Sequence, residues 1–170
     1  MAEKTLKASW KKTFLLTLGY LIMAWVGDVI LMVTLPMGQS KLEASGGFDN
    51  MTPGAILLLG CVIAPLIEEF LCRFLLFNGL RFTFRKVGGW FIKTPEWATW
   101  AANLAIVGSA LVFALMHQET VFGLFLMRFM FGFLAAHLYM KTGRFVSNLS
   151  LHMLHNALPL VLAVAFAGHV

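Results

Sequence analysis

Charged side chains are scarce in this chain, and their scarcity decides the class of protein. Asp, Glu, Lys and Arg make up 12% of the 170 residues, whereas a soluble domain carries about 25%. Apolar types make up 59%, so the chain cannot cover a water-facing surface. A soluble domain is excluded, and the composition predicts an all-α polytopic membrane protein with about five transmembrane helices around a polar intramembrane cavity.

Cysteines and sequence motifs for phosphate or metal binding are also few. The two cysteines, Cys61 and Cys72, lie about 16 Å apart if one helix carries both. A disulfide needs Cα atoms within about 7 Å, so free thiols are expected. No Gly-rich phosphate loop and no H-E-x-x-H zinc motif occurs. The net charge of +5 comes from residues between apolar segments, which favours contact with the lipid bilayer over nucleic acid.

Long apolar runs define the expected organisation. Five runs approach the ~20 residues that a bilayer requires, at about 14–35, 53–77, 97–116, 121–140 and 145–167. The polar segment 36–51 and the basic segment 78–96 are expected to be loops. Residues 1–52 then form a basic N-terminus, an uncleaved signal-anchor helix and a loop, and residues 53–170 form the core.

Lysine and arginine alternate between the two sides of this arrangement. The connecting segments carry 4, 1, 4, 0, 2 and 0 of them in chain order. Such residues concentrate on the cytoplasmic side of membrane proteins. The pattern predicts an integral protein with a cytoplasmic N-terminus.

Three charges stand in the second apolar run. Glu68, Glu69 and Arg73 are the only charged residues between Gly54 and Phe77, and each costs ~3 kcal/mol or more in lipid. Glu69 and Arg73 are four residues apart and neighbours on one helix face, so they can neutralise each other. Glu68 is rotated by about 100° and has no local cation. It is the candidate general base, and the pair is its support; the alternative is a salt bridge that only packs helices.

Histidines and an amide mark three later positions. His117 ends an apolar run, and His152 and Asn156 are four apart on one helix face. With Glu68 these groups could activate water and stabilise an oxyanion, at about 3 kcal/mol per donor. Zinc bound by Glu68, His117 and His152 is the rival use. As alternatives, His117 could cap a helix, and the others could join helices at about 0.6 kcal/mol each.

Three motifs in order carry a resemblance: Glu68-Glu69-x-x-x-Arg73, Phe113-x-x-x-His117 and His152-x-x-x-Asn156. Together they resemble the CPBP family of intramembrane proteases, also called ABI or CaaX-type proteases, over about residues 54–167. The resemblance implies a glutamic protease without an obligatory metal. It implies that Glu68 and His117 activate water, that His152 and Asn156 form the oxyanion hole, and that Glu69 and Arg73 support the site.

The short chain is similar to prokaryotic members in the cytoplasmic membrane, including the myxosortase-like group that removes sorting signals. The expected substrate is a membrane-anchored protein or peptide with a C-terminal tail, a lipid or a sorting signal. A non-catalytic bacteriocin-immunity or scaffolding role remains an alternative. A proton-coupled transporter is a third reading, because intramembrane Glu, Arg and His also form proton relays.

The predicted spans create a depth problem. His117 would lie at the outer surface, more than about 10 Å in depth from Glu68, too far to share a proton. The catalytic reading therefore requires either that the turn at 118–120 is sunk into the membrane or that the second span extends past Phe77, so that Glu68 lies near mid-depth. A protein-lined cavity that His117 and Glu119 face is expected. Arg128 is expected to pair with Glu119 or Asp28.

Overall fold

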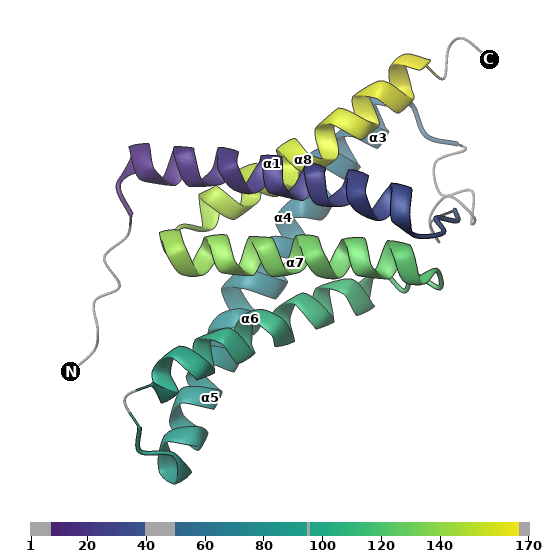
Figure 1. The fold of residues 1–170 in the computed structure, drawn as a ribbon. Helices are drawn as coiled ribbons and strands as arrows, with labels where there is room; N and C mark the ends of the chain where they lie inside the picture. Colours follow the sequence, from purple (N-terminus) through teal and green to yellow (C-terminus); the bar gives the residue numbers. More distant parts are fainter. Residues whose placement is uncertain (1–7, 40–49, 95, 167–170) are drawn as a thin grey trace.

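The structure is a computed structural model that describes residues 8–39, 50–94 and 96–166, with side chains up to residue 162. The described part is helical, with short connections (Figure 1). In chain order the elements are α1 (Trp10–Thr34), α3 (Pro53–Leu58), η1 (Leu59–Ile63), α4 (Ala64–Glu69), η2 (Phe70–Phe77), α5 (Asn78–Phe91), α6 (Trp97–Met116), α7 (Phe122–Thr142) and α8 (Phe145–Phe166).

The helices confirm a polytopic membrane protein. Among the described residues, four helices are long and apolar enough to cross a bilayer: Trp10–Thr34, Pro53–Phe91, Trp97–Met116 and Phe122–Thr142. The fifth expected span, α8, has 22 residues. Large apolar side chains are exposed on the outside, and charged or polar ones such as Glu69 and Arg73 are buried. This inverted distribution is the one that a lipid environment favours.

The loop predicted over 78–96 is wrong for residues 78–91, which are helical, while residues 92–94 do form a connection. The second span continues through α5, and the helix Pro53–Phe91 is 39 residues long. Packing against α6 holds the basic segment in a helix: Trp97 Nε1 donates to the Phe84 carbonyl at 3.1 Å. Gly88 makes this approach possible, because a Cβ there would lie 1.7 Å from the Trp97 ring. Of the other expected loop, 36–51, residues 40–49 lie outside the described residues.

Two π-helical stretches, η1 and η2, interrupt the long helix on either side of the two glutamates. In η1 the Ala64 N–H bonds to the Leu59 carbonyl, five residues back. The next donor in this register would be Pro65, which has no N–H. The Gly60 carbonyl is therefore left for a partner from another helix. Such π stretches often occur at functional sites.

Small residues let α6 and α7 approach closely. A Cβ on Gly132 would lie 3.1 Å from the Ala110 Cα, and Ala135 and Ala136 are fully buried nearby in sequence. Small residues at helix crossings are typical of membrane proteins, since association there depends on close packing. The crossing places Phe113 and Phe131 side by side, with ring centroids 5.7 Å apart, and these rings form one wall of the polar interior.

Candidate active site

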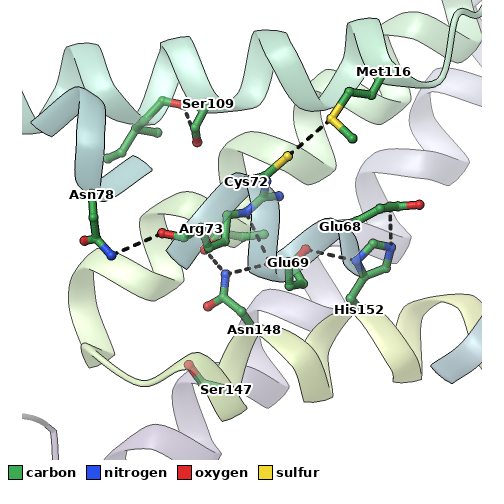
Figure 2. Close-up of polar contacts among 12 residues, drawn as sticks. Glu68, Glu69, Cys72, Arg73, Asn78, Ser109, Met116, Ser147, Asn148 and His152 are labelled. Atoms are coloured by element: carbon green, nitrogen blue, oxygen red, sulfur yellow. Dashed lines mark hydrogen bonds and ion pairs between the residues drawn. The ribbon is translucent and has the colours of Figure 1, made fainter. Parts of the chain in front are cut away.

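The expected pair of Glu69 and Arg73 is present and lies in the protein interior (Figure 2). Arg73 Nε lies 3.2 Å from Glu69 Oε2, and both side chains are 0% exposed. The guanidinium also lies 4.7 Å from the centre of the Phe113 ring. The arginine nitrogens lack a well-directed hydrogen bond, so charge attraction and the ring face hold Arg73 in place.

Glu69 has two further partners, both from α8, as Figure 2 shows. His152 Nδ1 lies 2.9 Å from Glu69 Oε1, and Asn148 Nδ2 donates to Glu69 Oε2 at 3.3 Å. Asn148 also donates to the Ala135 carbonyl at 2.7 Å, which links α4, α7 and α8. Sequence reasoning missed Asn148. Its signal was the four-residue spacing that places Asn148, His152 and Asn156 on one helix face.

Glu68 points away from Arg73, as its rotation predicted, and faces two histidines. Its Oε2 lies 3.8 Å from His117 Nε2 and 3.7 Å from His152 Nε2. The same oxygen is buried and has no hydrogen-bond partner. These distances exceed those of a hydrogen bond, so neither histidine satisfies the carboxylate oxygen.

The depth difference that the simple five-span arrangement implied between Glu68 and His117 is absent, and the alternative in which the second span extends past Phe77 is confirmed. Because the second helix continues to Phe91, Glu68 lies well inside it rather than near its end. The chain reverses direction directly after His117, where Gln118 adopts a positive φ of 52°. His117 thus stays beside the polar interior.

The hydrogen bonds of the two histidines identify the ring atoms that face Glu68. His117 Nδ1 lies 2.8 Å from the Phe113 carbonyl, which only accepts, so Nδ1 carries the proton. His117 lies just beyond the end of α6; burial, followed by the positive charge of Arg128, lowers its pKa from 6.5 to about 4. The ring is therefore neutral at pH 7, with the Nε2 lone pair toward Glu68.

The hydrogen bond of His152 also shows which of its ring nitrogens carries the proton. Its Nδ1 proton points to Glu69, so a neutral His152 also presents an Nε2 lone pair to Glu68. Glu68 Oε2 and the Nε2 atoms of His117 and His152 are then three hydrogen-bond acceptors that face one another. They require a hydrogen-bond donor among them. A water molecule, or a proton shared by Glu68 and His152, would supply that donor.

Asn156 lies one turn beyond His152 and is held by the π stretch. Its Nδ2 donates to the freed Gly60 carbonyl at 2.9 Å, which leaves the second N–H of the amide for another acceptor. A cavity of about 20 Å³ adjoins Asn156, His152 and Phe131. That volume accommodates about one water molecule.

Two outer ion pairs complete the surroundings. Arg128 pairs with Glu119, at 3.7 Å, which was one of its two expected partners. Asp28 instead pairs with His155, at 2.8 Å. Asp28 and Arg128 line the small cavity. The cavity lining does not include His117 or Glu119, contrary to expectation.

Zinc was the rival use of these residues, and it stays a prediction. Within the described residues, no group of three or more His, Cys, Asp or Glu side chains is arranged to hold a metal ion. Glu68, His117 and His152, the ligands that zinc would use, are close but do not form such a group. Cys61 and Cys72 are free thiols, as predicted, and Cys72 Sγ contacts Met116 Sδ at 3.7 Å.

The motifs lie in the part of the chain that matches a known family. The family model described as type II CAAX prenyl endopeptidase Rce1-like matches residues 50–158. The chain belongs to this family. Neither the curated proteins nor the solved structures gave a match.

The Rce1-like match covers every residue of the predicted site and supports the resemblance drawn from the three motifs. It identifies an integral membrane protein of a protease family. It does not extend to α1, which supplies Asp28 and packs against α7 and α8. The surroundings of the site therefore include a helix outside the family match.

Proposed function

We propose that this Rce1-like protein is an intramembrane endopeptidase that hydrolyses a peptide bond with water activated by Glu68 and His117. One observation supports this best: Glu68 Oε2 is buried and unpartnered and lies 3.7–3.8 Å from two imidazole Nε2 atoms. An orphaned buried acceptor is costly. A water molecule hydrogen-bonded to this oxygen would satisfy it and could be deprotonated there.

The reaction begins with attack of that water on the scissile carbonyl. Its oxygen bonds to the carbonyl carbon, and its proton passes to Glu68 or to the neutral His117, both of which can accept one. The tetrahedral intermediate collapses, the C–N bond breaks, and the accepted proton passes to the leaving amine. No protein nucleophile is required.

His152 and Asn156 are placed to stabilise the oxyanion. With one proton shared in the Glu68–His152 group, His152 can present an Nε2–H while its Nδ1–H remains on Glu69. Asn156 contributes the N–H that Gly60 does not use. Each donor is worth about 3 kcal/mol in comparable sites.

Glu69, Arg73 and Asn148 act through His152 rather than on the substrate. Glu69 fixes the His152 ring at Nδ1, and Arg73 and Asn148 fix Glu69. Because all three are fully buried, this support is rigid and dry, as preorganised catalysis requires.

The substrate class follows from the location of the site. Glu68 lies within a spanning helix, so the scissile bond must reach membrane depth. A membrane-anchored protein or peptide, held by a lipid, a sorting signal or an apolar C-terminal tail, meets this requirement.

The test uses purified full-length protein and matched peptides: a prenylated C-terminal tail, the same tail without the lipid, and an apolar sorting-signal tail. Mass spectrometry should find cleavage of at least one peptide. Glu68→Gln should lower the rate by about 10²–10⁴-fold, whereas the exposed control Glu96→Gln should leave it unchanged. A chelator should have no effect.

Two outcomes would contradict the proposal. Cleavage that persists in a folded Glu68→Gln variant would remove Glu68 from the chemistry. Inhibition by a chelator that only zinc reverses would show a metal mechanism. Peptide binding without cleavage would favour a non-catalytic family member.

A further inference from the structure

A cavity lies away from the candidate site, between α1 and α8. It measures about 280 Å³, near the lower end of the range for ligand pockets. Apolar side chains form most of its wall, and hydroxyls of Thr13, Thr17, Ser147 and Ser150 are interspersed. An apolar ligand with a few polar atoms fits such a lining.

The length of the groove matches one leaflet of a bilayer. It runs from Trp10 to Leu21 along α1 and from Val146 to Leu154 along α8. At 1.5 Å per residue these stretches are about 16 and 12 Å long. Half of the ~30 Å hydrocarbon core is about 15 Å. The groove thus spans about the depth of one acyl chain.

The end of the groove near Trp10 is positively charged. Arg144 stacks on the Trp10 ring with its guanidinium carbon 4.0 Å from the ring centre and uses Nε to hold the Ala8 carbonyl at 2.9 Å. Lys11 and Lys12 are exposed on the first turn of α1. Both α1 and α8 begin here, so the positive ends of two helix dipoles add to the charge.

An orphaned hydroxyl lies inside the groove, about one helical turn from Trp10. Thr13 is only 5% exposed, and its Oγ1 is buried without a hydrogen-bond partner. Its hydroxyl can therefore donate a hydrogen bond to a ligand atom, whereas the neighbouring Thr17 hydroxyl donates to the Thr13 carbonyl at 2.9 Å. An acceptor at this depth, just below a phosphate, is what a glycerol ester carbonyl would provide.

We propose that the groove binds one anionic phospholipid as a specific ligand. One acyl chain lies between α1 and α8, an ester carbonyl accepts a hydrogen bond from Thr13, and Arg144 with Lys11 and Lys12 holds the phosphate. The lipid contacts both helices and so links α1, which lies outside the family match, to α8, which carries His152 and Asn156.

Lipid retention on the purified full-length protein tests this directly. The protein is exchanged into a neutral detergent, mixed with equal amounts of dioleoyl phosphatidylglycerol or dioleoyl phosphatidylcholine, and weighed by native mass spectrometry. One phosphatidylglycerol should be retained per protein, with about tenfold preference, the change expected from one charge-assisted contact. Inorganic phosphate should neither bind nor raise the unfolding temperature.

Variants assign the lipid to the groove. Arg144→Gln should remove most of the preference, and Thr13→Val should weaken retention about threefold through the lost hydrogen bond. Ser150→Trp should block retention by filling the groove. Lys93→Gln, which removes an exposed charge from the α5–α6 connection, should behave as wild type.

Several results would overturn the proposal. Equal retention of the two lipids, a shift with inorganic phosphate alone, or wild-type behaviour of Arg144→Gln would each do so. If Ser150→Trp does not fold, Thr13→Val and Arg144→Gln decide, since neither changes the shape of the groove much. These measurements require no peptide substrate and stand apart from the test of proteolysis.

Discussion

Removal of Arg73 is the most informative perturbation of the buried charges. Arg73→Met leaves Glu69, which is 0% exposed, without its cation. Loss of one partner of a buried ion pair costs about 3–5 kcal/mol. The lower end is expected, about 3 kcal/mol, because Glu69 retains His152 and Asn148.

The Glu69→Gln variant should lose more stability than Arg73→Met. The double variant should lose less than the two single losses added together. Glu69→Gln leaves the Arg73 guanidinium with little beyond the Phe113 ring, so we expect a loss of about 4 kcal/mol. In the double variant both charges are gone. The amide of the new glutamine keeps only part of its hydrogen bonds, so the free energy of unfolding should fall by about 2 kcal/mol. The two single effects would sum to about 7 kcal/mol, so the coupling energy is about 5 kcal/mol.

Equilibrium unfolding in detergent measures this cycle. A loss of 3 kcal/mol should lower the unfolding temperature by about 6–12 °C for a chain of this size. The matched control is the outer pair, with Arg128→Met and Glu119→Gln, where Arg128 is 37% exposed and the coupling should stay below about 1 kcal/mol. Additive effects of Arg73→Met and Glu69→Gln would refute the account of a coupled buried pair.

Three further predictions follow from local geometry. In an NMR titration of labelled imidazole, His117 should titrate near pH 4 rather than 6.5. Arg128→Gln should raise this midpoint, because it removes a repelling positive charge. A wild-type midpoint at 6.5 or above would contradict the prediction. Pro65→Ala restores an N–H that competes with Asn156 for the Gly60 carbonyl, so peptide cleavage should fall about tenfold or more while the unfolding temperature holds. Gly132→Ala, whose Cβ meets the Ala110 backbone at 3.1 Å, should cost about 1–3 kcal/mol and more than Gly27→Ala, which meets only the flexible Met130 side chain; equal unfolding temperatures would argue against close backbone contact at Gly132.

The sequence predicted the elements whose signal is local. Apolar length located α6 with the observed bounds, Trp97–Met116, because a span is defined by its own residues. Four-residue spacing correctly paired Glu69 with Arg73 and turned Glu68 away from them. Both arguments need only the geometry of one helix.

The failures concern contacts between helices. Segment 78–96 was expected to be a loop because of its charges and paired glycines, yet Gly88 accommodates the ring of Trp97 from α6. The depth of His117 relative to Glu68 stayed open between two alternatives, because the length of the second helix depends on its packing against α6. Asn148 was missed because its partners, Glu69 and the Ala135 carbonyl, come from other helices. The catalytic roles of Glu68, His117, His152 and Asn156 stay predictions until cleavage is measured.

The long helix that carries the glutamates has a mechanical consequence. Its 39 residues measure about 58 Å at 1.5 Å each, roughly twice the hydrocarbon thickness of a bilayer. The helices α6 and α8, with 20 and 22 residues, match that thickness. Hydrophobic mismatch depends on apolar length, and the apolar part of the long helix, residues 53–77, measures about 38 Å. A thinner membrane would therefore change the tilt of this helix more than that of its neighbours. Glu68 lies on the long helix and its two histidines on or next to the shorter ones, so bilayer thickness should affect the proposed proteolysis. Reconstitution in lipids of different chain length would measure this.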